Sequence, residues 1–341
     1  MYKKWQVPII QGGMGVGISM GSLAGAVARE GGMGVISTAI IGFREPDAWT
    51  NPLEAGIRAL QKEIRKAREI SRGNGAIAIN AMVVTTDYRA MVDAAIEEGV
   101  DAVISGAGLP LELPEIAGER NVMLAPIVSS ARAAKLIARS WARKNRRPDF
   151  IVVEGPDAGG HLGFSSEELH QCSAESLEEI VSSVVSEHPD TPVFAAGSVF
   201  DAEDICRMRK LGAEGVQIAT RFIATEECDA SQEYKDAILH ATQENLRIIE
   251  SPVGLPGRAI DSPLLQRVRE RGRIVPTRCR SCIKTCNPKE TKYCISTALI
   301  KAFCGDWENG LFFAGANVGR VRWMTTVREL MSELKQGFQA L

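Results

Sequence analysis

The sequence predicts an α/β fold, a (β/α)8 TIM barrel with a helical lobe inserted after the eighth strand. Three observations indicate it: eight short apolar runs, amphipathic segments between most of them, and a change of character after Thr220. Alternating strands and helices imply parallel βαβ units, and eight such units favour a closed barrel. An open doubly wound sheet stays an alternative on counting alone, because Pro110 and Pro114 interrupt the connection between the fourth and fifth runs.

Each predicted strand is a short apolar run, and most of the runs lead into a polar or glycine-containing loop, as buried parallel strands do. In chain order the strands are Val7–Gln11, Gly34–Ser37, Ala76–Asn80, Ala102–Ser105, Val122–Ile127, Phe150–Glu154, Pro192–Ala196 and Gly215–Thr220. The helices expected between them are amphipathic and cover Gly21–Glu30, Pro52–Arg72, Tyr88–Glu98, Ala131–Lys144, Ala174–Glu187 and Ala202–Leu211.

The chain divides into three predicted parts. Residues 1–221 hold all eight strands and form the barrel, and residues 222–320 form a helical, cysteine-rich lobe over its mouth. The lobe begins with a helical stretch near Gln232–Ile249. Residues 321–341 return to the barrel through an amphipathic helix over Thr325–Leu341, with Val327, Leu330, Met331 and Leu334 on one face.

The composition is that of an ordinary globular enzyme. Hydrophobic residues make up 45% of the 341 residues and charged residues 24%, and the formal net charge is −2. Such a charge argues against a nucleic-acid partner. No apolar run is long enough to cross a membrane, and the first residues lack an apolar signal segment, so we expect a cytoplasmic protein without a membrane partner.

Residues 154–163 carry the strongest functional signal, Glu-Gly-Pro-Asp-Ala-Gly-Gly-His-Leu-Gly, directly after an apolar strand. Gly159 and Gly160 lack a Cβ, so this loop can approach a ligand closely. His161 follows the carboxyl end of the strand, where parallel α/β folds place their chemistry. We predict His161, one of four histidines, to be catalytic; the alternative is a histidine that only caps a loop.

Other strand-end loops add candidate ligand contacts. Gly12 and Gly13 allow flat backbone contact with a planar ring, although a tight turn would also use them. Asn80 could bond a ligand or satisfy neighbouring backbone. Gly197–Ser198 and Gln217–Thr220 follow the seventh and eighth strands, the loops between which barrel enzymes hold a phosphate group.

Four cysteines crowd into sixteen residues, as Cys279, Cys282, Cys286 and Cys294. Such a cluster suits one metal centre in a reducing compartment, with a [4Fe–4S] cluster favoured over zinc. Packing cysteines or a disulfide are the alternatives, and a disulfide is disfavoured in the cytosol.

Taken together, these motifs identify a resemblance that runs through Pro8–Met14, Asn80, Ala158–His161, Ala195–Gly197, Gln217–Thr220 and Ser251–Arg258. The chain resembles the nitronate monooxygenase family, formerly called 2-nitropropane dioxygenases, which includes FMN-dependent enoyl-acyl-carrier-protein reductases. The resemblance implies a TIM barrel holding one FMN at its mouth.

The resemblance also implies roles for individual residues. Backbone of Gly12, Gly13 and Met14 would line the isoalloxazine, Asn80 would contact it, and Gly159 and Gly160 would pack near it. The FMN phosphate would be held by Gly197, Ser198, Gln217, Ile218, Ala219 and Thr220. His161 would be the catalytic base or proton donor. Glu154 departs from the pattern, because many members have glutamine there; this puts a carboxylate near the flavin.

The activity implied by the resemblance is oxidation of nitronates or nitroalkanes by dioxygen. The runner-up is an FMN enzyme, with or without an iron–sulfur cluster, that reduces, dehydrogenates or isomerises acyl-carrier-protein thioesters; some relatives of that branch carry such a cluster. Any NAD(P)H would then bind at the same mouth, since no separate dinucleotide-binding domain is evident. A non-catalytic flavin-binding module is the third alternative.

Overall fold

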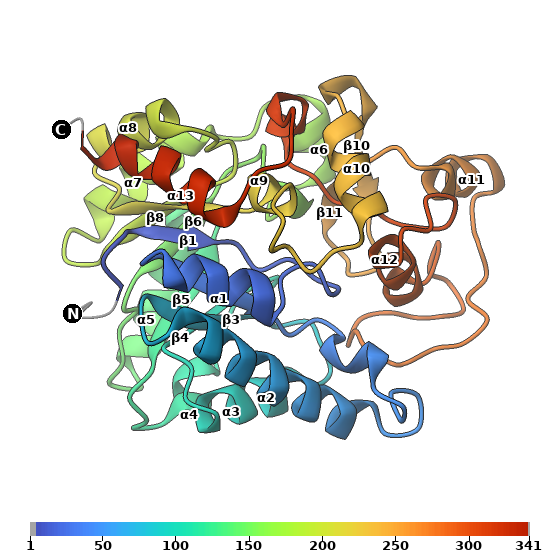
Figure 1. Ribbon diagram of the computed structural model, residues 1–341, viewed down its shortest axis with the longest axis horizontal. Coiled ribbons are helices and arrows are strands. Elements are labelled where there is room, and N and C mark those ends of the chain that lie inside the picture. The colour runs from blue at the N-terminus through green and yellow to red at the C-terminus, as the bar shows by residue number, and fades with distance from the viewer. Residues whose placement is uncertain (1–4, 340–341) are drawn as a thin grey trace.

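The computed structural model describes residues 5–339 and contains a closed barrel of eight parallel strands. In Figure 1 the barrel strands lie in the left half of the molecule. The barrel strands are β1 (Ile9–Gln11), β2 (Met33–Ser37), β3 (Ala76–Met82), β4 (Ala102–Gly106), β5 (Met123–Val128), β6 (Ile151–Glu154), β8 (Val193–Ala196) and β9 (Gly215–Ile218). They are ordered as in the sequence, and β9 closes the barrel by pairing with β1, Ile10 opposite Gln217. The predicted barrel is therefore confirmed, and the open sheet is excluded.

Helices cover the outside of the barrel between consecutive strands. They are α1 (Gly21–Arg29), α2 (Pro52–Ser71), α3 (Tyr88–Glu97), α4 (Leu113–Ala117), α5 (Ala131–Ala142), α7 (Leu177–Glu187) and α8 (Ala202–Lys210). The short α4 fills the connection that the prolines left in doubt. Pro114 lies in the first turn of that helix, where a missing backbone N–H leaves no hydrogen bond unmade.

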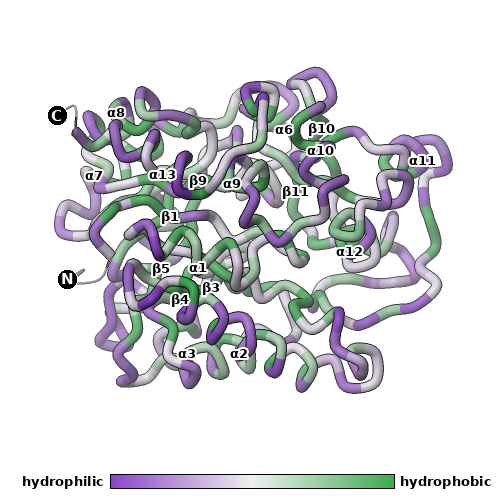
Figure 2. The backbone as a smooth tube through the Cα atoms, viewed as in Figure 1, coloured by the Kyte–Doolittle hydropathy of each residue, from purple (hydrophilic) through white to green (hydrophobic). Residues whose placement is uncertain are grey.

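Apolar side chains fill both the barrel and the layer between strands and helices. In Figure 2 hydrophobic residues are frequent in the interior of the molecule, and hydrophilic residues lie mainly along its periphery, on outer helices and turns. At the amino-terminal end of the strands, Trp5 stacks on Phe194 at 5.0 Å between ring centroids, and Phe150 packs edge-on against both. These three rings fill the barrel at the amino-terminal ends of its strands, so ligands must enter from the carboxyl ends.

The prediction of a helix near Gln232–Ile249 is wrong for the second half of that range. Helix α10 ends at His240 and is followed by the 3-10 turn η2 (Gln243–Asn245) and strand β10 (Leu246–Glu250). Burial alternates between Leu246, exposed Arg247 and Ile248, as on a half-covered strand. The lobe therefore contains a sheet as well as helices.

That sheet joins the lobe to the mouth of the barrel. Its strands are β10, β11 (Pro256–Ile260) and β7 (Gly160–His161), and β7 belongs to the loop that follows barrel strand β6. The remaining elements beyond the barrel strands are α6 (Ser166–His170), α9 (Thr220–Ile223), α10 (Gln232–His240), α11 (Pro263–Arg271), α12 (Ile295–Phe303), and the 3-10 helices η1 (Ile41–Arg44) and η3 (Ala316–Arg320).

The C-terminal segment packs against two helices of the barrel. Helix α13 (Val327–Lys335) contacts α1 and α8, and all four apolar residues of its predicted face are buried. Thr326 and Glu329 form a capping box that starts the helix, and η4 (Gln336–Phe338) ends it. The last two residues of the predicted helix lie outside the described chain. Between residues 5 and 339, we find no helix with the length and apolarity needed to span a bilayer.

Candidate active site

Two adjoining cavities lie at the carboxyl ends of the barrel strands and share Glu154, Gly159 and Gln217 in their walls. The sequence-predicted ligand residues and His161 all line one or both. Gly12, Gly13, Met14, Asn80, Gly160 and His161 line the larger cavity, Gly197, Ser198 and Ile218 line the smaller, and Glu154, Gly159, Gln217, Ala219 and Thr220 line both. Residues spread over most of the barrel sequence thus meet around one connected space.

The two adjacent glycines of the His161 loop are required for different structural reasons. A Cβ on Gly159 would lie 2.4 Å from the carbonyl carbon of Ala314, so the lobe backbone can pack here only against glycine. Gly160 has a φ of +81°, a left-handed value, and a Cβ there would meet no atom within 4 Å. Gly159 therefore brings the lobe close, while Gly160 turns the chain and leaves room for a ligand.

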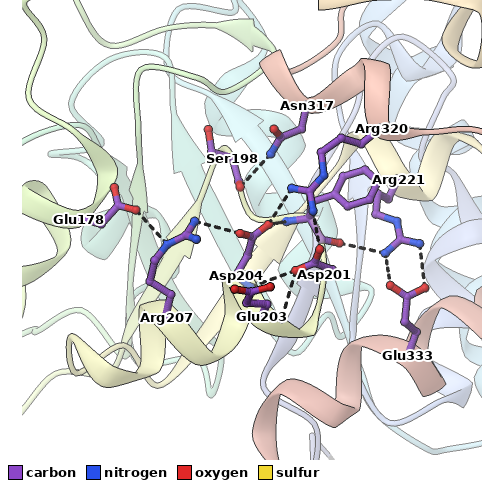
Figure 3. A network of polar contacts seen from close by, with 11 residues as sticks. Glu178, Ser198, Asp201, Glu203, Asp204, Arg207, Arg221, Asn317, Arg320 and Glu333 are labelled. Carbon is purple, nitrogen blue, oxygen red and sulfur yellow. Dashed lines mark hydrogen bonds and ion pairs between the residues drawn. The ribbon is translucent and has the colours of Figure 1, made fainter.

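The smaller cavity lies between the loops after β8 and β9. Gly197 and Ser198 both adopt positive φ, +80° and +65°, and Asn317 of η3 donates its Nδ2–H to the Ser198 carbonyl at 2.8 Å (Figure 3). Thr220 Oγ1 accepts the backbone N–H of Gly315 at 3.0 Å, so its own hydroxyl proton remains available to a ligand oxygen.

Ion pairs fix the outer side of the smaller cavity (Figure 3). Arg221 pairs in bidentate fashion with Glu333 of α13, at 2.6 and 2.9 Å, and donates to the Phe200 carbonyl. Arg320 joins η3 to Asp201 and Asp204 at the start of α8. Because these arginines are already paired, an anionic ligand would rely on uncharged donors of the cavity wall, such as the Ser198 and Thr220 hydroxyls and backbone N–H groups.

His161 lies in the wall of the larger cavity and is held from the lobe. Its Nε2 is 2.8 Å from Ser251 Oγ, and its ring meets Phe313 edge-on at 5.1 Å between centroids. Strand pairing sets this position, because His161 lies opposite Gly257 in the β7–β11 ladder. Burial disfavours the charged imidazolium and lowers the pKa of His161 to about 4, so the ring is neutral at neutral pH.

Glu154 ends strand β6, in register with Ala196 of β8, and faces both cavities. Among the described residues, none forms a hydrogen bond or ion pair with its carboxyl group. Burial without a partner raises the pKa of Glu154 to about 8, so this acid is largely uncharged at neutral pH.

Several cavity residues were not predicted from the sequence. Tyr234, Leu299, Phe313 and Ala314 complete the larger cavity from the lobe. No local sequence motif marks these four residues, because they reach the cavity only where the lobe folds back over the barrel. Ser251 lies at the start of the Ser251–Arg258 motif, so its position near the site could have been inferred from that motif.

The four clustered cysteines lie in the strap between α11 and α12, which docks on the loop after β3 through a bridge between Ile283 and Thr85. Cys282 Sγ lies 2.8 Å from Ser296 Oγ, and burial raises the pKa of the Cys282 and Cys286 thiols. Over residues 5–339, no three or more Cys, His, Asp or Glu side chains are gathered so that they could hold a metal ion. In this arrangement the four thiols are not gathered into the metal-ligand set that the sequence leads us to expect.

The two cavities do fit the flavin that the resemblance implies. The larger one offers glycine-rich backbone to a planar ring, and the smaller one offers backbone N–H groups and a hydroxyl to a single phosphate. The fold and this paired cavity define a TIM-barrel protein whose site suits a flavin. The family model described as nitronate monooxygenase matches residues 1–337, and the chain belongs to that family.

The individual proteins that the chain resembles share less than a third of its residues. The chain is 29% identical over 196 residues to a probable nitronate monooxygenase of Staphylococcus saprophyticus, a match that covers 57% of this chain and about half, 54%, of that protein. It is 24% identical over 269 residues, covering 79% of this chain and 67% of the relative, to the (3aS,4S,5R,7aS)-5-hydroxy-7a-methyl-1-oxo-octahydro-1H-indene-4-carboxyl-CoA dehydrogenase of Rhodococcus jostii. The solved structure of FabK from Thermotoga maritima superposes with a TM-score of 0.77 at 26% identity, covering 98% of this chain and 93% of FabK.

Proposed function

We propose that this protein is an FMN-dependent nitronate monooxygenase in which His161 is the catalytic base. The observation that carries the proposal is a neutral, cavity-facing imidazole beside a glycine-lined space that suits a flavin ring. FMN, when bound, supplies the redox chemistry by taking electrons from the substrate and passing them to dioxygen. Family membership and the probable nitronate monooxygenase relatives support the assignment.

The protein residues supply binding and proton transfer. His161 removes the Cα proton of a neutral nitroalkane, which leaves a nitronate anion and an imidazolium. The base must present a lone pair to the substrate, so the ring proton belongs on Nε2, where Ser251 Oγ can accept it. That oxygen also accepts the Val253 N–H at 3.3 Å, and its two lone pairs accommodate both donors.

The test compares His161→Ala with His170→Ala, which removes an exposed histidine of α6. His161→Ala should retain FMN yet lose about 10²–10⁴-fold in turnover of neutral nitroalkane, the range for a lost general base. Turnover of preformed nitronate should fall much less, because no proton is removed. Unchanged rates in His161→Ala would refute the catalytic role, and equal losses on both substrates would indicate anion binding instead.

A thioester reaction is the second candidate function. The Rhodococcus relative is named for a carboxyl-CoA substrate, and FabK is an enoyl-acyl-carrier-protein reductase. The larger cavity also has an apolar wall of Met82, Ile127 and Leu299 that suits an acyl chain. In that case NAD(P)H would reduce the flavin, and an acyl-carrier-protein or CoA thioester would reoxidise it without oxygen. Anaerobic reoxidation by such a thioester would favour this function.

We also propose, from spacing alone, that Cys279, Cys282, Cys286 and Cys294 bind one metal centre in the cytoplasm, where thiols stay reduced. The strap would have to close around the metal, because its thiols are not gathered into a ligand set. Elemental analysis of anaerobically purified protein should find about four iron atoms per chain, or one zinc ion. Neither metal together with four freely titrating thiols would refute the proposal.

A further inference from the structure

Glu154 is the one ionisable group that the walls of both cavities share, and no group within residues 5–339 pairs with its carboxyl. The other titratable groups in the cavity walls are Asp157, His161, Arg221 and Tyr234. His161 is neutral, burial raises the pKa of Tyr234 so that its phenol is neutral as well, and Arg221 is paired with Glu333. Among the residues that the structure describes, none therefore forms an ion pair or a hydrogen bond with the Glu154 carboxyl group, which faces the ligand space.

Arg258 is the other cation near this loop, and it is also occupied. Its Nη1 donates to the carbonyl oxygens of Pro156 and Ala158, at 2.6 and 2.8 Å, and its Nη2 lies 3.8 Å from Asp157. It fixes the backbone beyond Glu154 rather than neutralising the side chain. The group available to bond the Glu154 carboxyl is then a ligand in the cavity.

An uncharged carboxylic acid suits this position better than a carboxylate does. A buried charge without a partner is costly, whereas the neutral acid has one O–H donor and one carbonyl acceptor. The neutral acid, like an amide side chain, can donate one hydrogen bond and accept another. A carboxylate next to a flavin ring would instead repel the anionic reduced ring.

We propose that Glu154 binds the flavin as an uncharged carboxylic acid that donates a hydrogen bond to it, so that FMN affinity falls when this group ionises. The inference rests on the proposed FMN site and deepens it. Since burial alone raises the pKa of Glu154 to about 8, the protein should bind FMN tightly at neutral pH. Above that pH the dissociation constant should rise by up to about tenfold per pH unit, since each unit lowers the protonated fraction tenfold.

The test is FMN binding to apoprotein, followed by flavin fluorescence from about pH 6.5 to about pH 9.5, the span around this ionisation. The Glu154→Gln variant has an uncharged side chain at every pH, so any pH dependence of its FMN affinity reports the titration of the flavin's own groups. Glu119→Gln, at an exposed position, removes the same charge far from the cavity. We expect the alkaline loss of affinity in the wild type and in Glu119→Gln, and its disappearance in Glu154→Gln.

The same pH dependence in Glu154→Gln and the wild type would overturn the inference while leaving the FMN site intact. Failure of the wild type to bind FMN at any pH would overturn the proposed function and the inference with it. A measurement on the unaltered protein covers the case in which the variant does not fold: at neutral pH, FMN should shift the infrared carbonyl band of a protonated carboxylic acid. Absence of that shift would refute the neutral-acid contact.

Discussion

Replacing Ser251 by alanine tests how the lobe controls the proposed base. Ser251 Oγ lies 2.8 Å from His161 Nε2, and no other side-chain hydrogen bond of His161 is seen in residues 5–339. Without this acceptor, the ring proton has no preferred nitrogen, and the tautomer with a free lone pair toward the substrate becomes less populated. A neutral hydrogen bond contributes about 0.5–1.5 kcal/mol, which corresponds to roughly 2- to 13-fold in rate.

The assay is steady-state turnover of a neutral nitroalkane and of its preformed nitronate, with bound FMN checked by absorbance. Ser251→Ala should lose roughly 2- to 13-fold on the nitroalkane only, and Ser251→Thr, which keeps the hydroxyl, should recover part of the loss. Ser182→Ala, which loses a 2.8 Å bond to the Glu178 carbonyl on the exposed side of α7, is the matched control. A full-rate Ser251→Ala enzyme, or one impaired equally on both substrates, would refute the reasoning.

Three further outcomes follow from the geometry of the cavity. Gly159→Ala would place a Cβ 2.4 Å from the Ala314 carbonyl carbon, so the free energy of unfolding should fall by about 1–3 kcal/mol, the usual cost of overpacking. Because this clash displaces the cavity wall, FMN titration should also show weaker binding than in Gly56→Ala, where the nearest contact is 3.4 Å. Asn317→Ala should weaken FMN binding about 2- to 13-fold in that assay, since it frees the left-handed Ser198 loop; unchanged affinity would contradict this. Burial lowers the pKa of His161 to about 4, and the neutral imidazole is the form that acts as base. Nitroalkane turnover should therefore stay constant down to about pH 5 and decline only near pH 4. A pH profile of turnover with its midpoint near 6.5 would instead show that the imidazole is solvated.

The sequence predicted the parts of the molecule that local patterns determine. Short apolar runs located all eight barrel strands, because strands inside a barrel are buried on both faces. Apolar residues at helical spacing located α13, because one face of that helix is buried. The carboxyl ends of parallel strands meet at one edge, so residues such as Asn80 and Gly197 could be assigned to the same site from their positions after predicted strands.

Long-range contacts account for what the sequence did not predict. Ser251, Phe313 and Asn317 reach the site only because the lobe folds back through the β7–β11 pairing. The same pairing explains why the second half of the predicted helix near Gln232–Ile249 is a strand: β10 pairs with β11, which in turn pairs with a barrel loop. The pKa values of Glu154 and His161 likewise depend on burial by elements distant in sequence.

The most direct test of the central claim is anaerobic mixing of the FMN-loaded protein with a nitronate, with NAD(P)H and with an acyl thioester in parallel. The nitronate should bleach the flavin absorbance as fast as the enzyme turns over, and admission of oxygen should restore the absorbance while the nitronate is converted. A flavin that nitronate leaves oxidised, yet that NAD(P)H bleaches and an enoyl thioester restores without oxygen, would contradict the central claim.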